Sequence, residues 1–224
     1  EHGATGGNQH IFFSLIRPGD RVIAFSPSYQ QFYSAPEALG AEVTVLRLRR
    51  ENGYLPDLDE LSQAAARGVR MICLNNPNNP TGTLIPSDML KDIVTIARQS
   101  GAYLFCDEVY SGVSIDGATA PSVCDLYEKG IATGSMSKAF SLAGLRLGWL
   151  ATHDRQALAQ FRRVGDYALV SCGLFDEEIA ALALAHKEKI LERNRAILAA
   201  NLPILDAWVK GETHVSYVRP TAGT

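Results

Sequence analysis

Short, nearly all-apolar runs alternate along this chain with amphipathic segments of helical period. The apolar runs that we expect to be strands are 21–25, 41–48, 71–74, 102–106, 131–133 and 147–151. We expect helices in three segments: from after Tyr29 to about Leu39, over 58–66, and over 87–99. Asp57 is the expected N-cap of the second. A strand that is apolar on both faces must be covered on both sides, which is typical of a parallel sheet. We therefore predict an α/β fold, a mostly parallel central sheet with helices on both faces.

The two ends of the chain depart from this alternation. Residues 1–7 indicate a turn that enters a helix, and no strand precedes it. From Asp176 the pattern is helical almost to Trp208, with a kink or break expected at Pro203 because proline lacks the amide donor. Residues 215–224 predict a strand and a turn. We expect a fragment of a longer chain, with a large domain over 1–185 and a long helix with the start of a smaller, truncated α+β domain over 186–224.

Composition argues against several classes of protein. The 21 Lys and Arg against 24 Asp and Glu give a net charge of −3, and no basic stripe suggests nucleic acid as a partner. The sequence contains no run of about 18 apolar residues, so no membrane span is predicted. Residues 1–7 lack the pattern of a signal peptide. The cysteines contain no Cys-x-x-Cys pair and the histidines are scattered. We expect buried thiols in a reducing, cytoplasmic compartment and no metal site.

Lys138 follows one of the predicted strands, in a loop of small and apolar residues. No other charged residue occurs between Ile131 and Leu145. A lysine in such a loop is usually a solvated surface charge. A lysine that loses part of its hydration is instead available as a nucleophilic amine, which permits a Schiff base.

Other polar residues also follow predicted strands, where ligands of parallel sheets collect. Asp107 ends one strand; it is either a helix cap, a metal ligand, or a carboxylate that pairs with a pyridinium nitrogen and keeps that ring an electron sink. Tyr110, in the same loop, can reach the phenolic oxygen of such a ring. Asn75, Asn76, Asn78 and Asn79 lie in a turn rich in Asn, Pro and Gly, and spacing does not choose among them.

An anion can be held by residues from two further segments. Gly6, Gly7 and Asn8 open a predicted helix, where backbone N–H groups and the helix dipole favour phosphate, although most Gly pairs are plain turns. Ser135 and Arg146 can add a hydroxyl and a guanidinium, unless Arg146 forms a surface ion pair. Tyr29 can stack on a flat ring or be an ordinary tyrosine of the core or surface.

Together these segments resemble the class I/II aminotransferases of the pyridoxal 5′-phosphate (PLP) enzymes of fold type I. The stretch 135–149 is similar to the family's cofactor-lysine signature, with an arginine eight residues after the lysine. Asn79-Pro80-Thr81-Gly82 resembles its Asn-Pro-Thr-Gly turn, which selects Asn79, and Asp107-Glu108-Val109-Tyr110 resembles its Asp-x-x-Tyr strand end. Pro27-Ser28-Tyr29 and Gly6-Gly7-Asn8 match its stacking and phosphate segments, and all these motifs occur in the family's order.

The resemblance implies a role for each residue. Lys138 would hold PLP as a Schiff base and then serve as general base and acid, and Asp107 would pair with the pyridine nitrogen. Asn79 and Tyr110 would bind the phenolic oxygen, and Tyr29 would stack on the ring. The phosphate ligands would be Gly6, Gly7, Asn8, Ser135 and Arg146. The implied protein is a homodimeric, PLP-binding transaminase of an amino acid and a 2-oxo acid.

Two features of the family are absent from these residues: an N-terminal segment that covers the substrate, and the small domain with the arginine that binds the substrate carboxylate. The cofactor motifs therefore leave the reaction open. A PLP-dependent lyase or cyclising synthase of amino-acid metabolism is an alternative on the same fold, and an inactive PLP-binding fragment is another.

Overall fold

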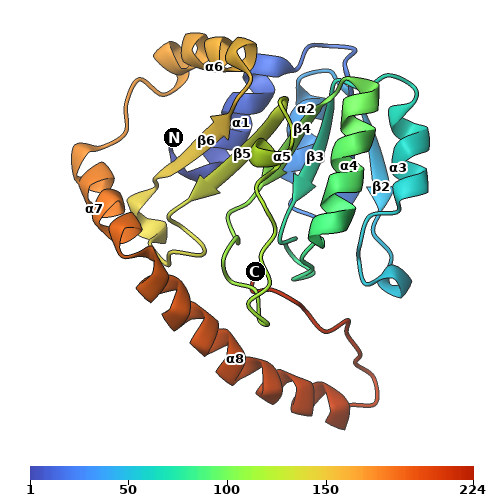
Figure 1. The fold of residues 1–224 in the computed structure, drawn as a ribbon, viewed down its shortest axis with the longest axis vertical. Coiled ribbons are helices and arrows are strands. Elements are labelled where there is room, and N and C mark those ends of the chain that lie inside the picture. Colours follow the sequence, from blue (N-terminus) through green and yellow to red (C-terminus); the bar gives the residue numbers. More distant parts are fainter.

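The computed structural model describes residues 1–224, and its centre is a six-stranded sheet (Figure 1). Neighbouring strands are parallel except for the last pair, which is antiparallel. In sheet order the strands are β2 (Glu42–Arg47), β1 (Arg21–Ser26), β3 (Met71–Asn75), β4 (Tyr103–Asp107), β5 (Gly130–Ser135) and β6 (Gly148–Thr152). The predicted mostly parallel sheet is confirmed, whereas the apolar pattern of residues 147–151 does not reveal that β6 reverses direction.

Helices cover both faces of the sheet. One face carries α3 (Leu58–Ala65), α4 (Ser87–Ser100) and the short α5 (Val123–Leu126), and the other carries α1 (Gly3–Leu15), α2 (Gln31–Ala38) and α6 (Arg155–Ala168). Successive side chains of a strand point to opposite faces. In β1, Val22 and Ala24 accordingly pack into the core beneath α1 and α2, while Ile23 and Phe25 pack into the core beneath α3 and α4.

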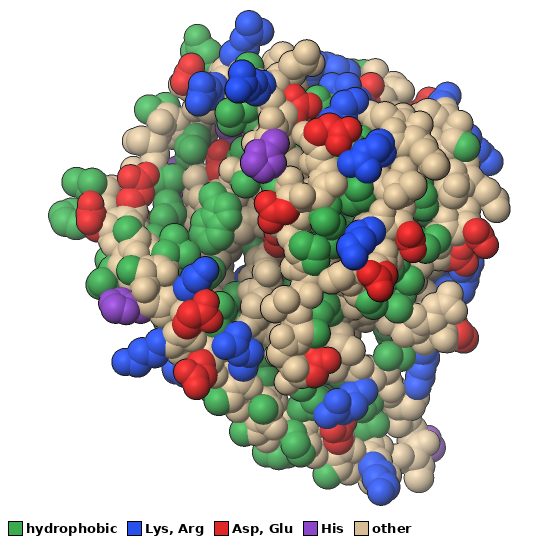
Figure 2. Space-filling view, in the orientation of Figure 1, with side chains coloured by type: hydrophobic (Ala, Val, Ile, Leu, Met, Phe, Trp, Pro, Cys, Tyr) green, Lys and Arg blue, Asp and Glu red, His purple; other side chains and the backbone are tan.

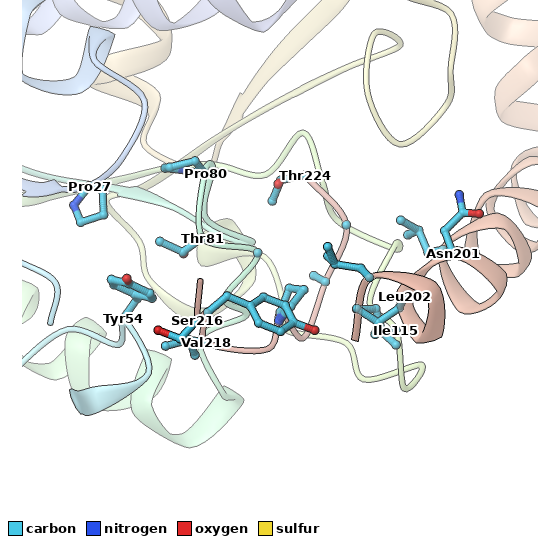
Figure 3. A pocket seen from close by; sticks show the side chains of 17 residues that line it. Pro27, Tyr54, Pro80, Thr81, Ile115, Asn201, Leu202, Ser216, Val218 and Thr224 are labelled. Atoms are coloured by element: carbon cyan, nitrogen blue, oxygen red, sulfur yellow. The ribbon is translucent and has the colours of Figure 1, made fainter. Parts of the chain in front are cut away.

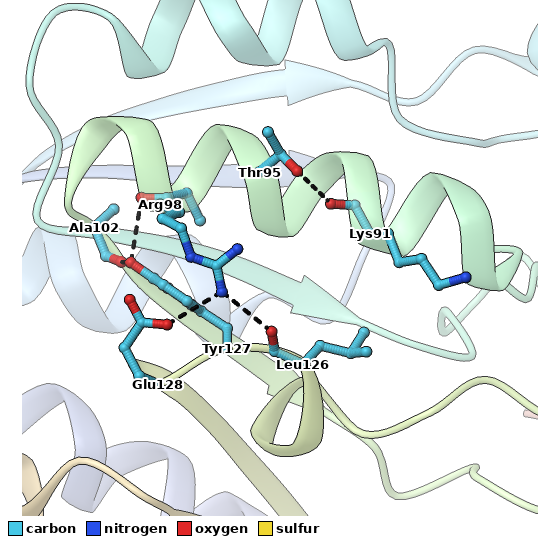
Figure 4. A network of polar contacts seen from close by, with 8 residues as sticks. Lys91, Thr95, Arg98, Ala102, Leu126, Tyr127 and Glu128 are labelled. Carbon is cyan, nitrogen blue, oxygen red and sulfur yellow. Dashed lines mark hydrogen bonds and ion pairs between the residues drawn. The ribbon is translucent and has the colours of Figure 1, made fainter.

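A polar network anchors α4 to the turn before β5 (Figure 4). The hydroxyl of Tyr127 donates to the carbonyl of Ala102 at 2.9 Å. Arg98 donates to the carbonyl of Leu126 at 3.3 Å and to the carboxylate of Glu128 at 3.1 Å, and its guanidinium lies 5.2 Å from the centroid of the Tyr127 ring. These contacts join the end of α4 to the starts of β4 and β5.

Aspartate N-caps begin two of the helices. The carboxylate of Asp57 accepts from the amides of Asp59 and Glu60 at 3.0 Å each, which confirms the predicted cap of α3. Asp154 caps α6 in the same way, accepting from the amide of Gln156 at 2.7 Å. The sequence analysis did not predict α6, although Asp154 is a common residue at the start of a helix.

The C-terminal helices correct one prediction. The helical region divides into α7 (Leu174–Ala185) and α8 (Lys187–Gly211), so the break falls at His186. Pro203 does not end the helix. It lies exposed within α8. Proline has no amide hydrogen, so the carbonyl of Ala199, four residues earlier, has no helical donor, but Ala199 is exposed and water can reach it.

The strand predicted for residues 215–224 is wrong. This segment lies along the turn after β3 and the loop after β4, and forms only an isolated bridge between Ser114 and Ala222. The amides of Thr221 and Ala222 both donate to the carbonyl of Gly82 at 2.9 Å. Turn residues do not offer the regular row of donors and acceptors that a strand requires, so the ladder does not propagate.

Two short 3₁₀ helices complete the secondary structure, η1 (Arg50–Asn52) and η2 (Ala143–Leu145). None of the helices combines the length and the apolar character that crossing a membrane would demand.

Candidate cofactor site at the carboxyl ends of the strands

The register of the sheet aligns polar residues at one edge. Asn75 pairs with Asp107 across β3 and β4, and Asp107 pairs with Thr133 across β4 and β5. A cavity of about 170 Å³ opens beyond these strand ends. Most of the residues predicted from the sequence line it: Tyr29, Asn79, Asp107, Tyr110, Ser135, Lys138 and Arg146.

Asp107 is the acidic group of the cavity, and its side chain is only 4% exposed. Its carboxylate accepts from the amide of Asn8 at 2.9 Å and from the backbone N–H of Val109 at 3.1 Å. Burial raises the pKa of Asp107 to about 6, against the opposite effects of these two donors and of the positive charge of Lys138. A cationic ring nitrogen in the cavity would remove the cost of keeping this carboxylate ionised.

Lys138 lies in the loop between β5 and β6, and its Nζ is 5.9 Å from the centroid of the Tyr110 ring. Its side chain is exposed and forms no ion pair within 4 Å. The small neighbouring residues therefore do not desolvate this lysine as the sequence led us to expect. The amine is free to react with a group placed in the cavity.

Arg146 and the start of α1 form the other end of the cavity. The Nη1 atom of Arg146 donates to the hydroxyl of Ser137 at 3.1 Å and to the carbonyl of Ala143 at 2.9 Å. Ala4 and Thr5, in the first turn of α1, also line the cavity. The first amides of a helix have no partner within it and favour an anion, and a guanidinium adds charge and directional donors.

The residues predicted to open the helix lie inside it. Because α1 begins at Gly3, Gly6 and Gly7 are its fourth and fifth residues, and neither lines the cavity. Asn8 lies one residue further on, fully buried, and contacts Asp107 instead of the anion end. Ala4 and Thr5, the two residues before the Gly pair, line the cavity instead, and the sequence analysis did not single them out because a Gly pair is the more familiar signal.

Asparagine contacts distinguish Asn79 from its neighbours. The amide of Asn75 donates to the carbonyl of Asp107 at 3.0 Å, and that of Asn78 donates to the carbonyl of Pro27 at 3.1 Å. The side-chain oxygen of Asn76 accepts from the amide of Ile85. Only the side chain of Asn79 has no hydrogen bond within the protein, and it lines the cavity. The hydrogen bonds therefore leave Asn79 available to a ligand.

The two tyrosines of the cavity differ in exposure. Tyr110 is 7% exposed and lies beside Lys138, whereas Tyr29 is 41% exposed at the mouth. The ring of Tyr29 packs edge-on against Phe32, with a centroid distance of 6.0 Å, and leaves a flat surface toward the cavity.

A larger cavity of about 540 Å³ lies beside the turn that follows β3 (Figure 3). Pro80 and Thr81 of that turn face Asn201 and Leu202 of α8 across it, and Ser216 to Thr224 close one side. Its lining carries no Lys, Arg, His, Asp or Glu side chain.

The small cavity fits a flat, aromatic, anionic cofactor. A carboxylate lies at one end, an arginine and helix amides lie at the other, and an amine, an unpaired amide and a tyrosine ring lie between them. The lining of the cavity contains no His or Cys, the side chains that transition metals prefer as ligands. No group of three or more His, Cys, Asp or Glu residues is placed to hold a metal ion. The groups match the ring nitrogen, oxygen, aldehyde and phosphate of PLP.

Known proteins resemble this chain over most of its length. A family model described as aminotransferase class I and II matches residues 2–215. Aspartate aminotransferase of Pyrococcus horikoshii is 30% identical over 83% of this chain and 48% of its own length. Capreomycidine synthase of Streptomyces vinaceus is 28% identical over 85% of this chain and 49% of its own length.

A solved structure of a PLP-dependent aminotransferase from Streptococcus suis superimposes with a TM-score of 0.94 at 48% identity, covering 99% of this chain and 58% of that chain. The chain thus spans about half the length of the curated relatives it matches. Because the family model extends over nearly all of its residues, the chain belongs to the aminotransferase class I and II family.

Proposed function

We propose that these residues are the cofactor-binding part of a PLP-dependent aminotransferase that moves an amino group between an amino acid and a 2-oxo acid. The observation that carries the proposal is the shared cavity of Asp107, Lys138 and Arg146. Asp107 comes from a strand end and the other two from the loop between β5 and β6, and the fold brings a buried acid, a free amine and a guanidinium to one small volume. The family membership supports the same chemistry.

When bound, PLP supplies a conjugated ring that draws electrons from the α-carbon of an amino acid. The carboxylate of Asp107 holds a proton at the ring nitrogen, and Asn8 and Val109 hold the carboxylate. Asn79 and Tyr110 bind the phenolic oxygen, and Tyr29 covers the ring face. Ser135, Arg146 and the amides of Ala4 and Thr5 bind the phosphate.

Lys138 is the catalytic residue of this proposal. Its amine would hold the aldehyde carbon of the cofactor covalently and would be released there by the substrate amine. The freed Nζ would take the proton from the substrate α-carbon as a general base and return it, as a general acid, to the cofactor carbon on the other side of the nitrogen. The loop around Lys138 is held by Asn194 of α8, whose amide donates to the carbonyl of Ala139 at 2.8 Å and to the hydroxyl of Ser141 at 2.9 Å.

The test uses the full-length protein that contains these residues, loaded with PLP. Borohydride reduction followed by peptide mass spectrometry should place the cofactor mass on Lys138, and addition of an amino donor should convert the visible band to that of the pyridoxamine form. Lys138→Ala should abolish both signals. Lys129→Ala is the matched control, because Lys129 lies at the opposite end of β5 and donates only to the carbonyl of Gly101. A parent protein that takes up no PLP would refute the proposal.

A second candidate is a PLP-dependent synthase or lyase, which the likeness to capreomycidine synthase favours. The same cofactor residues serve both reactions, because the outcome depends on the groups that choose the substrate. A protein that binds PLP on Lys138 but never forms the pyridoxamine species with any amino donor would favour this second candidate.

We also propose that residues 1–185 are the PLP-binding large domain and that 186–224 begin a smaller domain. The helix break at His186 supports this boundary. The four cysteines are unpaired, three of them buried, which supports a reducing compartment such as the cytoplasm.

The assembled enzyme is proposed to be a homodimer. Apolar side chains gather over α7 on the face shown in Figure 2. In and before this helix, Tyr167, Val170 and Phe175 are 92%, 81% and 82% exposed. Such a patch favours association. Light scattering of the full-length protein would measure its oligomeric state, and a monomer at micromolar concentration would contradict the proposal.

A further inference from the structure

Asn8 is buried between the elements that carry the cofactor site. It lies in α1, has no exposed surface, and uses both ends of its amide. The nitrogen donates to Asp107 Oδ2 at 2.9 Å and to Gln31 Oε1 at 3.2 Å. The oxygen accepts from the hydroxyl of Thr133 at 2.8 Å. A single side chain thus bridges α1, β4, β5 and the start of α2.

The carboxylate of Asp107 determines which end of this amide faces it, because an ionised carboxylate can only accept a hydrogen bond. The oxygen of Asn8 therefore faces Thr133, whose hydroxyl donates to it. Thr133 is the register partner of Asp107 on β5, and the amide of Glu108 donates to its carbonyl at 2.8 Å, so its position is fixed by the sheet. The amide of Asn8 thus has a fixed partner at each end.

Gln31 extends the network to the anion end of the cavity. Its oxygen accepts from Asn8, and its nitrogen donates to the carbonyl of Thr5 at 3.0 Å. Thr5 is in the first turn of α1 and lines the cavity. A continuous chain of hydrogen bonds therefore joins the carboxylate at one end of the cavity to the helix start at the other.

We propose that Asn8 is a positioning residue of the cofactor site: its amide, whose oxygen is held by the hydroxyl of Thr133, holds the carboxylate of Asp107 toward the ring and couples it through Gln31 to Thr5. The proposal rests on the proposed function, because the ring that Asp107 faces is that of PLP. Asn8 itself does not line the cavity, so its effect passes through Asp107. A hydrogen bond to a charged, buried acceptor is among the stronger ones, and losing it leaves the carboxylate less well held.

The test compares variants of the full-length protein. Asn8→Leu keeps the approximate size of the side chain and removes the amide. Thr133→Val is isosteric and removes only the hydroxyl, while Thr133→Ser retains it. Ser14→Ala is the control, because Ser14 is also buried in α1 and its hydroxyl has no hydrogen-bond partner.

Two quantities separate positioning from mere stability. The first is the dissociation constant of PLP, and the second is the pH titration of the Asp107 carboxyl in cofactor-free, ¹³C-labelled protein. We expect Asn8→Leu to raise the dissociation constant about tenfold or more and Thr133→Val to raise it by a smaller factor. The pKa of Asp107 should rise in Asn8→Leu, since the amide donor lowers it, while Lys138, Glu108 and the N–H of Val109 remain in place. Thr133→Ser and Ser14→Ala should match the parent.

An Asn8→Leu or Thr133→Val protein that only melts at a lower temperature, with both quantities unchanged, overturns the positioning role. If Asn8→Leu does not fold, the same two quantities measured in Thr133→Val decide the question. A parent that binds no PLP overturns the proposed function and the role toward the ring with it. A parent that binds PLP while the Asp107 titration stays unmoved by either substitution overturns only the inference about Asn8.

Discussion

The guanidinium of Arg146 lies against Gly3, with Nη2 2.8 Å from the point that a β-carbon on Gly3 would occupy. Gly3 is the first residue of α1 and has a φ of +67°, a backbone conformation that residues with a β-carbon rarely adopt. The missing side chain therefore has two effects. It allows the helix start to form in this conformation, and it lets the arginine approach the amides of the first turn.

Gly3→Ala should weaken phosphate binding and also destabilise the protein, by about 1–2 kcal/mol from the backbone conformation alone. The β-carbon would push Arg146 away from Ser137. Isothermal titration with PLP would measure the first effect and chemical denaturation the second.

Gly6→Ala is the matched control for this substitution. Gly6 lies inside the same helix with an ordinary 3.4 Å contact to the β-carbon of His2. Alanine there should stabilise the helix by up to about 1 kcal/mol and leave PLP affinity unchanged. A loss of affinity in Gly6→Ala instead would return the phosphate site to the Gly pair.

Arg146→Gln should lower affinity for PLP about tenfold or more and leave affinity for pyridoxal, which lacks the phosphate, nearly unchanged. The reason is that the guanidinium lies at the anion end of the cavity, away from Asp107. Competition binding with both compounds would measure the difference, and Arg163→Ala, an exposed arginine on α6, is the control. Equal losses for the two compounds would contradict the assignment.

Glu108→Gln should stabilise the cofactor-free protein above neutral pH. Burial raises the pKa of Glu108 to about 7, although Ser122 and the amide of Val123 both donate to its Oε1 atom. Between the unfolded value and this one, the folded state binds more protons than the unfolded state, so stability falls as pH rises through that window. Glutamine keeps the acceptor and avoids the charge.

The expected gain is roughly 1–3 kcal/mol at about pH 8 and near zero at about pH 4. Urea denaturation at the two pH values would measure it. A gain that is the same at both values would mean that the charge of Glu108 is not its cause.

Pro203→Ala should stabilise the protein by about 1–2 kcal/mol, since the helix already continues through this exposed position and alanine restores a hydrogen bond. Part of the gain is lost to the greater freedom of the unfolded chain. Chemical denaturation would detect it. A decrease in stability would show that the proline shapes the packing of α8.

The sequence predicts which residues meet at the cavity where polar residues follow strands. Asp107 ends an apolar strand and Lys138 lies in the loop after another, and both line the cavity. Arg146 precedes β6, and its spacing from Lys138 in the resemblance indicated it. Spacing alone did not choose Asn79 among the four asparagines; the resemblance did. In the structure the side chains of the other three are hydrogen-bonded within the protein, which leaves Asn79 available.

The errors arise where tertiary contacts decide. The helix α1 begins at Gly3, where Arg146 packs against the backbone, and no local pattern reveals this start, so the Gly pair predicted to open the helix lies inside it. The continuation of α8 through Pro203 depends on exposure, and the absence of a strand after residue 214 depends on the turn that it meets. The exposure of Lys138 likewise follows from the shape of the cavity and not from its neighbours in sequence.

The reversal of β6 has a consequence for the order in which the site assembles. Lys138 and Arg146 lie on one hairpin between β5 and β6, so the chain brings the amine and the guanidinium together by closing a loop of about a dozen residues, at small entropic cost. The start of α1 must meet this hairpin from the far end of the sequence, through the bridge between His2 and Leu147. We therefore expect the ability to capture phosphate to appear late in refolding, as a reporter that the start of α1 has docked against the hairpin of β5 and β6.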